Sequence, residues 1–338
     1  MFYKNVELYN VAEINGENSL TRISDKLRIT LNESAKSAAL SAAGCEIRFN
    51  LKSGTGKIIL KLKDEPVISF PVAEVYQGVF KSASYSLSAE PTEIPIAFPQ
   101  NIEVLDKIAK EKNLPFDSRL FRVILPYGPA IEIPKIEGDF SPPVEGQTPQ
   151  ARYLAYGSSI THGSVAIRPT GSYAMRTAQL LGVDLINLGF GGGAHCESQM
   201  ADYIAERNDW DFATLELGIN VVGSFETAEF KKRVEYFVKK ITTTHPDKWI
   251  FCIDLFTFSA DFDPASTKQN DFRKIVKETV EKLKMPKVVH FDGREILKSY
   301  SGLMAGDLVH PSPEGMEEMA RNLSATIAKQ ALPLHKKM

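Results

Sequence analysis

The chain has 338 residues, of which 43% are hydrophobic and 24% are charged, and its formal net charge is −2. This composition is that of an ordinary folded protein, and the length favours two domains. A nearly neutral chain lacks the basic surplus of nucleic-acid-binding proteins. No stretch reaches the roughly 20 apolar residues that span a bilayer, and the first residues do not resemble a secretory signal. We therefore expect a cytoplasmic protein that binds neither nucleic acid nor membrane.

Up to about residue 140, short β-branched or alternating runs recur between Gly, Ser, Pro and Asp residues such as those at 53–56. This pattern predicts the short strands of a β-sandwich or jelly roll. One helix is expected at 101–112, where apolar residues recur every three or four positions. We expect strands at 26–31, 46–49, 57–62, 66–70, 120–125 and 130–133.

The stretch 139–150 is rich in proline, glycine and polar residues, which is typical of a linker. It predicts a β-sandwich domain at 1–145 and a second domain at 151–335. After the linker, strands and helices alternate, which indicates an α/β domain whose parallel sheet is covered by helices on both faces. Its active site should lie at the carboxyl ends of the strands. We expect strands at 152–156, 183–188, 212–217, 248–255 and 288–291. Helices are expected at 172–181, 196–207, 228–243 and 313–331, and a further helix after the fourth strand should end at 284.

Two candidate site segments follow the first two of these strands. The first is the turn 156–163, in which the Ser159 hydroxyl could act as a nucleophile near helix N-terminal amides. Small residues also serve simply to make such a turn. The second is the glycine-rich run 187–195, whose amides could approach a developing negative charge. This run could equally cradle a phosphate, but the dinucleotide and Walker-type fingerprints are missing.

Two further candidates come later in the chain. Asn220 follows the third strand, and its side-chain amide could donate a hydrogen bond to an oxyanion, although such an asparagine often only makes a turn or caps a helix. Asp307 and His310 precede the last helix. An imidazole can take the proton of a serine hydroxyl, and a carboxylate three positions earlier can hold its other nitrogen.

Together, the four segments resemble the SGNH hydrolase superfamily, also called GDSL esterases, over about residues 151–330. The resemblance implies a flavodoxin-like α/β/α sandwich and a serine esterase. Ser159 matches the nucleophile, whose backbone N–H is one oxyanion donor, and Gly192 and Asn220 match the other two donors. His310 matches the general base and Asp307 its orienting partner.

The sequence departs from the family pattern at two positions and leaves one ambiguous. Ser158 stands where the family usually has an aspartate before the nucleophile, and Val221 replaces an aspartate that often follows Asn220. Neither is needed for proton transfer, although the first change can alter how the nucleophile turn is braced. Because three glycines are consecutive, Gly191 or Gly193 could supply the oxyanion amide instead of Gly192.

The expected reaction is acyl transfer to water through an acyl-enzyme, which requires no metal and no organic cofactor. Cys45, Cys196 and Cys252 are widely spaced, so neither a disulfide framework nor a metal site is expected. The β-rich first half resembles that of two-domain SGNH esterases, several of which act on carbohydrates. We therefore favour short acyl esters, particularly acetyl groups on saccharides, with His162 and His195 as candidate substrate contacts.

Three other functions remain open at this point. One is a lysophospholipase or thioesterase, which would act on longer acyl chains. Another is a glycan-binding protein whose hydrolase half has decayed, which the intact set of five matching residues argues against. Nucleotide binding at the glycine run is the third, and it lacks a supporting fingerprint. The sequence does not predict the oligomeric state.

Overall fold

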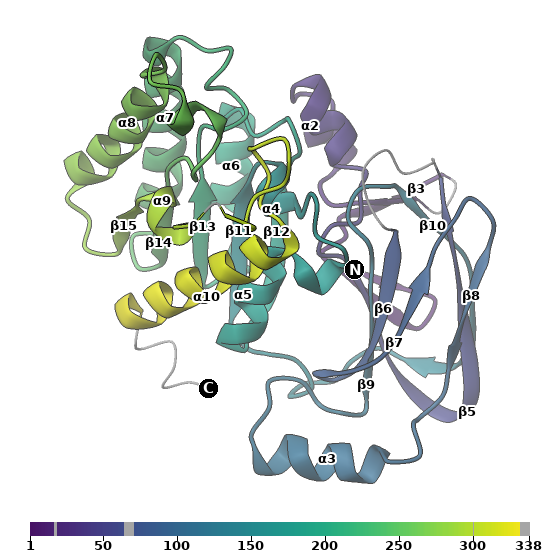
Figure 1. The fold of residues 1–338 in the computed structure, drawn as a ribbon. Coiled ribbons are helices and arrows are strands. Elements are labelled where there is room, and N and C mark those ends of the chain that lie inside the picture. Colours follow the sequence, from purple (N-terminus) through teal and green to yellow (C-terminus); the bar gives the residue numbers. More distant parts are fainter. Residues whose placement is uncertain (17–18, 64–70, 300, 332–338) are drawn as a thin grey trace.

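A computed structural model describes residues 1–16, 19–63, 71–299 and 301–331 of the chain. An antiparallel β region, formed by the residues up to 141 and called here the first half, lies beside an α/β region that begins at residue 152, the second half (Figure 1). None of the described helices is both long and apolar enough to cross a membrane.

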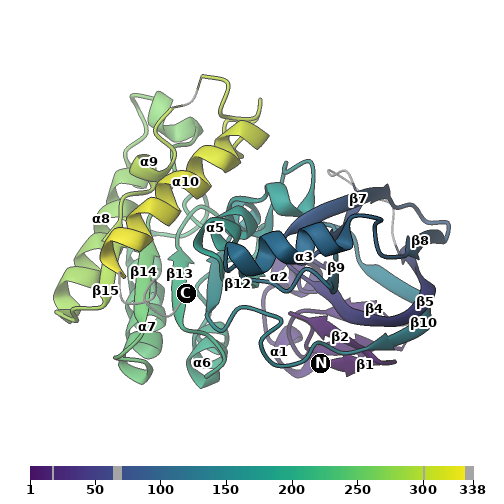
Figure 2. The same cartoon turned by 90° about the horizontal axis from the view of Figure 1, so that it is seen from below.

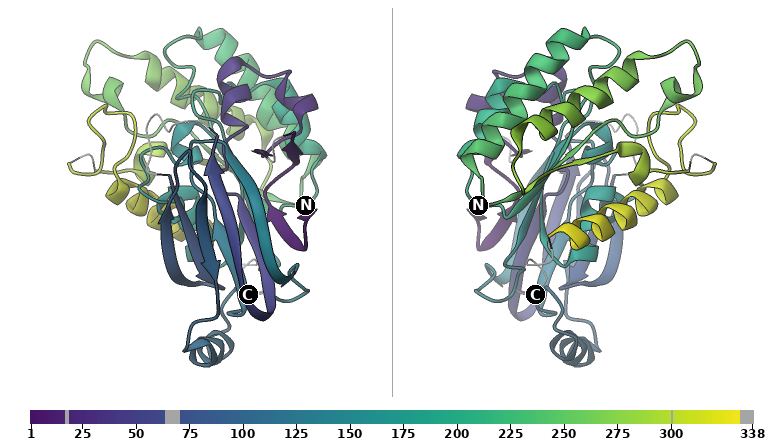
Figure 3. Two further views of the ribbon diagram at one scale, coloured as in Figure 1. Left: turned by 90° about the vertical axis from the view of Figure 1, so that its right-hand side faces the viewer. Right: turned by 90° about the vertical axis from the view of Figure 1, so that its left-hand side faces the viewer.

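The described residues of the first half form ten strands in one hydrogen-bonded sheet, which confirms the predicted β-sandwich class (Figure 3). The long strand β5 connects its parts, because its beginning pairs with β2 and β9 and its later residues pair with β8 and β10. The predicted punctuation at 53–56 therefore lies inside a strand. The strands are β1 (Phe2–Tyr3), β2 (Val6–Tyr9), β3 (Glu13–Asn15), β4 (Ser19–Thr21), β5 (Glu46–Leu62), β6 (Val72–Gln77), β7 (Phe80–Ser86), β8 (Thr92–Ile96), β9 (Leu120–Ile124) and β10 (Ile131–Ser141).

Helix α3 (Ile102–Glu111) is close to its predicted range, but the strand predicted at 26–31 is wrong. Two short helices, α1 (Asp25–Arg28) and α2 (Glu33–Ala38), occupy this region. Each begins at a side-chain cap: Ser24 accepts from an amide of α1, and Asn32 accepts from an amide of α2. Such caps satisfy the first amides of a helix and so favour helix over strand. The strand predicted at 66–70 falls outside the described residues.

The second half is an α/β/α sandwich, as predicted. Its five strands are parallel and lie in the order β12-β11-β13-β14-β15. β12 and β13, which follow β11 in the chain, lie on opposite sides of it, so the strand order reverses at β11. In such sheets ligands bind at the carboxyl ends of the strands beside this reversal point. The strands are β11 (Arg152–Gly157), β12 (Asp184–Gly189), β13 (Phe212–Glu216), β14 (Trp249–Ile253) and β15 (Val288–Phe291).

Helices cover both faces of this sheet, and each face has its own buried cluster (Figure 2). Helices α6, α7 and α8 pack together on one face, and α5 packs with α10 on the other. A short helix, α4, follows β11 directly. The helices are α4 (Ser159–His162), α5 (Tyr173–Leu181), α6 (Ser198–Glu206), α7 (Thr227–Thr244), α8 (Lys268–Leu283), α9 (Gly293–Ile296) and α10 (Pro313–Gln330), with 3-10 turns at Pro169–Gly171 and Ser259–Phe262.

The two halves are joined by buried contacts of two kinds. Ala35, in α2, and Ala39, just after it, belong to the same apolar cluster as Phe190 of the second half. Figure 3 shows the purple helical segment of the first half beside the helices of the α/β region. The Arg48 guanidinium makes two hydrogen bonds, of 2.9 and 2.7 Å, to the carboxylate of Asp184, and both side chains are buried. The predicted domain limits of 1–145 and 151–335 remain a prediction, since the segment around α2 packs into the second half.

Candidate active site

The structure brings Ser159, His310 and Asp307 into one hydrogen-bonded chain at the carboxyl end of β11. Ser159 Oγ lies 2.8 Å from Nε2 of His310, and Nδ1 of the same ring lies 2.6 Å from Oδ2 of Asp307. Because the carboxylate accepts the Nδ1 hydrogen, Nε2 is left as the acceptor for the serine hydroxyl. These contacts have the geometry of a serine nucleophile, its base and an orienting carboxylate.

Asp307 is held in place by the loop that carries it. Its Oδ1 accepts hydrogen bonds from the backbone amides of Val309, at 2.9 Å, and His310, at 3.0 Å. Burial raises the pKa of Asp307, but the hydrogen bonds from the His310 side chain and from these two amides outweigh it and hold the pKa below its ordinary value. The carboxylate therefore stays ionised opposite His310 in mildly acidic solution.

The nucleophile turn rests on a buried carboxylate that the sequence did not single out. Glu216, the last residue of β13, accepts from the amide of Ser158 at 2.6 Å and from the hydroxyl of Thr161 at 2.8 Å. A Cβ on Gly157 would lie 2.3 Å from this carboxylate, so a glycine is required there. The available signal was an acidic residue at the end of a strand that carries no other charged residue. Glu216 thus supports the turn where the family usually has an aspartate before the nucleophile.

Two backbone amides near Ser159 are without a partner among the described residues, namely those of Ser159 and Gly192. Ser159 is the first residue of α4, so its amide has no intrahelical acceptor. In the glycine run, the amide of Gly191 donates to Nδ1 of His162 at 3.3 Å, and that of Gly193 donates to the carbonyl of Phe190 at 2.9 Å. Of the three candidate glycines, Gly192 is therefore the one whose amide is free.

Asn220 lies in the turn after β13 and is oriented by the same loop. Its Oδ1 accepts from the amide of Ala194 at 3.0 Å. With the oxygen engaged, the side-chain amide group remains available as a donor. Asn220 therefore contacts the loop two residues after Gly192, with only Gly193 in between.

The two candidate substrate histidines lie in different surroundings. His162, at the end of α4, is only 4% exposed, and both of its ring nitrogens contact protein atoms. The ring is therefore enclosed, and the structure does not place it where substrate could reach it. His195 is half-buried, and its Nε2 lies 3.0 Å from the carbonyl of Gly192, so it flanks the glycine run.

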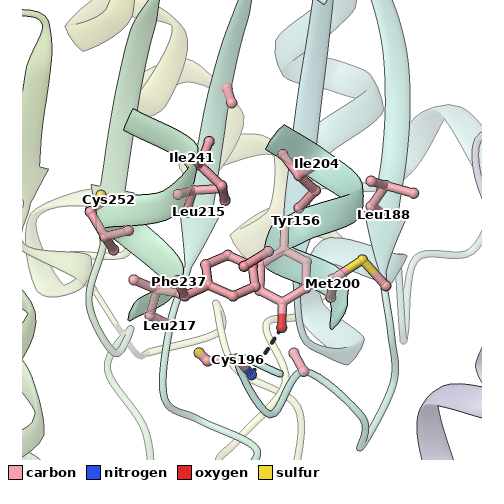
Figure 4. Packing of buried hydrophobic residues seen from close by; sticks show 14 of the residues in the cluster. Tyr156, Leu188, Cys196, Met200, Ile204, Leu215, Leu217, Phe237, Ile241 and Cys252 are labelled. Atoms are coloured by element: carbon pink, nitrogen blue, oxygen red, sulfur yellow. Dashed lines mark hydrogen bonds between the residues drawn. The ribbon is translucent and has the colours of Figure 1, made fainter. Parts of the chain in front are cut away.

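The glycine run is also bounded by residues that come from elsewhere in the fold. Asn32, the cap of α2, donates to the carbonyl of Gly193 at 2.9 Å. A Cβ on Gly193 would lie 2.4 Å from the backbone nitrogen of Ala35, so α2 can approach this closely only because residue 193 is glycine. Figure 4 shows a second support, in which the Tyr156 hydroxyl accepts from the amide of Cys196 at 3.2 Å.

No group of three or more His, Cys, Asp or Glu side chains within the described ranges is arranged to hold a metal ion. Cys45, Cys196 and Cys252 are buried free thiols. Burial raises the pKa of Cys45 and Cys252 to about 12, so both remain protonated at neutral pH.

Known structures resemble the chain over nearly its whole length. Salicylyl-acyltransferase SsfX3, from a tetracycline biosynthetic pathway, matches with a TM-score of 0.81 and 16% identity, covering 97% of this chain and 95% of that one. A Bacteroides ovatus protein named as a GDSL-like lipase matches with 0.74 and 19%, covering 97% and 96%. A family two carbohydrate esterase from Cellvibrio japonicus matches with 0.64 and 16%, covering 96% and 95%. At these identities the likeness establishes the fold.

The amino-acid sequence itself identifies the protein family. A comparison with curated protein sequences finds no significant match. Residues 150–328, more than half of the chain, match the family model of GDSL-like lipases and acylhydrolases. This range contains Ser159, Gly192, Asn220, Asp307 and His310. The chain belongs to the GDSL-like lipase/acylhydrolase family.

Proposed function

We propose that this ester hydrolase removes short acyl groups, in particular acetyl groups, from saccharides through an acyl-enzyme on Ser159. Family membership makes the protein an acylhydrolase. The observation that carries the proposed mechanism is the chain from Ser159 Oγ to His310 and Asp307, with two unpartnered amides beside it.

In the first step, His310 takes the hydroxyl proton as Ser159 Oγ attacks the ester carbonyl. The carbonyl oxygen becomes an oxyanion, which accepts hydrogen bonds from the amides of Ser159 and Gly192 and from the side chain of Asn220. One such donor typically contributes about 2.7–4 kcal/mol of transition-state stabilisation. Asp307 stabilises the imidazolium that forms.

In the second step, His310 protonates the leaving alcohol and the carbon–oxygen bond to it breaks. Water then enters, loses a proton to the same nitrogen and attacks the acyl-enzyme. The oxyanion forms again in the same hole, and collapse releases the acid and regenerates the Ser159 hydroxyl. Every proton transfer passes through Nε2 of His310, for which the 2.8 Å contact is suitable.

A cleft lies between the two halves of the chain. It has a volume of about 820 Å³, runs along α5 and is lined by polar groups such as Arg168 and Glu314 and by the aromatic ring of Tyr76. Clefts of this size at domain interfaces commonly take small-molecule ligands. Ser159, Gly192, Asn220, Asp307 and His310 are not among the residues that line this cleft, so it is separate from the reacting groups. A saccharide as the alcohol part is supported instead by the name of a protein that shares the fold. The Cellvibrio japonicus esterase, a carbohydrate esterase by name, has the same fold.

The test compares the wild type with Ser159→Ala on p-nitrophenyl acetate, with circular dichroism on both. A second serine variant, Ser198→Ala, changes an exposed hydroxyl and serves as the matched control. We expect Ser159→Ala to fall to background while remaining folded, and Ser198→Ala to match the wild type. Wild-type turnover by Ser159→Ala would refute the nucleophile.

Substrate class is tested by two series. With p-nitrophenyl esters of increasing chain length, kcat/KM should be highest for acetate, and a maximum at long chains would favour a lysophospholipase or thioesterase. With acetylated saccharides, release of acetate should exceed that from simple alkyl acetates. Sugar binding without any ester hydrolysis would instead favour the glycan-binding alternative.

A further inference from the structure

The buried ring of His162 lies where three distant segments meet behind the glycine run. Its Nδ1 accepts from the amide of Gly191 at 3.3 Å. Its Nε2 contacts the hydroxyl of Ser41 and lies 3.3 Å from Nη2 of Arg22. Arg22 and Ser41 both come from the first half, so the ring connects that half to the loop that carries the free Gly192 amide.

The amide of Gly191 selects one tautomer of His162, and Arg22 Nη2, a donor that lies 3.3 Å from Nε2, donates to the carbonyl of Ala38 instead. Because Nδ1 faces an N–H, it must be unprotonated, and a neutral ring then carries its hydrogen on Nε2. That hydrogen is donated to Ser41 Oγ, whose own hydroxyl donates to the carbonyl of Ala38 at 2.8 Å. The chain of donors thus runs in one direction, from the Gly191 amide through the ring to Ser41 and Ala38.

Arg22 prevents the ring from taking a second proton. Arg22 is 1% exposed and pairs with no carboxylate among the described residues. Its guanidinium donates to the carbonyls of Ser41 at 3.0 Å, Ala38 at 2.6 Å and Asn187 at 2.9 Å. The full positive charge therefore lies beside Nε2, and the ring of Tyr127 packs edge-on against the imidazole. Burial, together with this cation, lowers the pKa of His162 well below its ordinary value.

We propose that Arg22, Ser41 and His162 form a positioning relay through which the first half of the chain keeps the glycine run in the conformation that leaves the Gly192 amide free for the oxyanion. The inference rests on the proposed function and adds residues that contact neither substrate nor reacting atoms. His162 fixes the Gly191 peptide by accepting its hydrogen. The neighbouring bond from Gly193 to Phe190 closes the turn, and the intervening amide is directed to the site.

Loss of the Nδ1 acceptor should therefore affect the chemical step rather than binding. Without it, the Gly191 amide loses its partner, and the peptide can rotate to find another. A displaced Gly192 amide no longer reaches the oxyanion, and losing one such donor typically lowers kcat about 10²–10³-fold. KM should stay within about threefold, because the donor acts mainly in the transition state.

The decisive pair of variants is His162→Asn and His162→Leu. The Asn oxygen can take the position of Nδ1 and accept from Gly191, whereas Leu fills similar space without an acceptor. We expect His162→Asn to retain kcat within about tenfold of wild type and His162→Leu to lose about 10²-fold or more at unchanged KM. Equal kcat for the two variants would overturn the relay, because a role in packing alone does not distinguish them.

A double-mutant cycle tests the part assigned to Arg22. Arg22→Met removes the cation while keeping much of the side-chain volume. If both residues act through one relay, the losses in kcat from Arg22→Met and His162→Leu should not add in the double variant. Additive losses would show that Arg22 acts independently and would overturn its place in the relay.

A third measurement does not depend on esterase activity. Nitrogen NMR of ¹⁵N-histidine-labelled wild-type protein, with His162→Asn to assign the signal, should show His162 neutral with its hydrogen on Nε2 at pH 6.5, where an ordinary imidazole is half protonated. A protonated Nδ1 would refute the relay even if His162→Leu or Arg22→Met fails to fold. Ser159→Ala separates the two proposals: if this variant retains turnover, the proposed function fails, whereas a dead Ser159→Ala beside a fully active His162→Leu defeats the relay alone.

Discussion

Asn220 offers the sharpest test of the oxyanion site, because its side-chain NH2 group can be replaced while its side-chain oxygen is kept. Its Oδ1 holds the amide of Ala194, and its amide group is the predicted oxyanion donor. Asn220→Asp keeps an oxygen for Ala194 but places a carboxylate oxygen where the donor was. Removing one donor raises the barrier by about 2.7–4 kcal/mol, which corresponds to a 10²–10³-fold lower kcat. Repulsion between the new charge and the oxyanion adds to this loss.

Asn220→Ala is the matched variant, since it removes both the donor and the acceptor. Its kcat should fall by a similar factor, but it should also be less stable by about 1 kcal/mol, because a hydrogen bond to the loop is lost. Steady-state kinetics on p-nitrophenyl acetate give kcat and KM, and urea unfolding gives the stability. Retention of kcat within threefold by Asn220→Asp would refute the assignment of Asn220 as a donor.

Asp307→Asn presents an N–H to Nδ1 of His310, and we expect kcat to fall about 10²-fold. This loss is smaller than the roughly 10⁴-fold loss expected for a fully buried aspartate, because the side chain of Asp307 is half exposed. An unchanged kcat would exclude an orienting role for Asp307. Asp184→Asn breaks the buried pair with Arg48 and should lower the urea unfolding free energy by about 3 kcal/mol; unchanged stability would contradict it. Burial raises the pKa of Glu216 above its ordinary 4.5, so its contribution to stability is lost as pH rises from 4.5 through the folded value. Glu216→Gln should lose less stability over that range, and parallel curves for the two proteins would be inconsistent with this.

The second half could be predicted closely from the sequence because its signals are local. Strands buried on both faces form continuous apolar runs, and the fifth strand was expected at 288–291, where β15 lies. Ser159, Gly192 and Asn220 follow strand ends and His310 precedes the last helix. The resemblance of these four segments to a known family is what predicted that Ser159 and His310 lie together. Helix ends were also marked, as at Gly182, the left-handed cap of α5.

The first half was predicted less well because its structure depends on contacts between distant residues. The run 26–31 has the apolar content of a strand, but the caps before α1 and α2 and the packing of α2 on the second half decide the outcome. Periodicity alone cannot show this. Arg22 contacts His162 across 140 positions of sequence, and no pattern near either residue indicates the other. The same holds for Glu216, which looked like one residue of an ordinary strand.

The glycine run explains why the two halves cannot be treated as a binding module attached to a complete enzyme. Its outer side is covered by α2, which approaches as far as the missing side chain of Gly193 permits. Its inner side contacts His162, whose partners Arg22 and Ser41 also belong to the first half. Both constraints act on the peptide groups on either side of Gly192. A loop of consecutive glycines has little conformational preference of its own, so in the proposed relay the contacts from the first half provide the order that a preformed oxyanion hole would require.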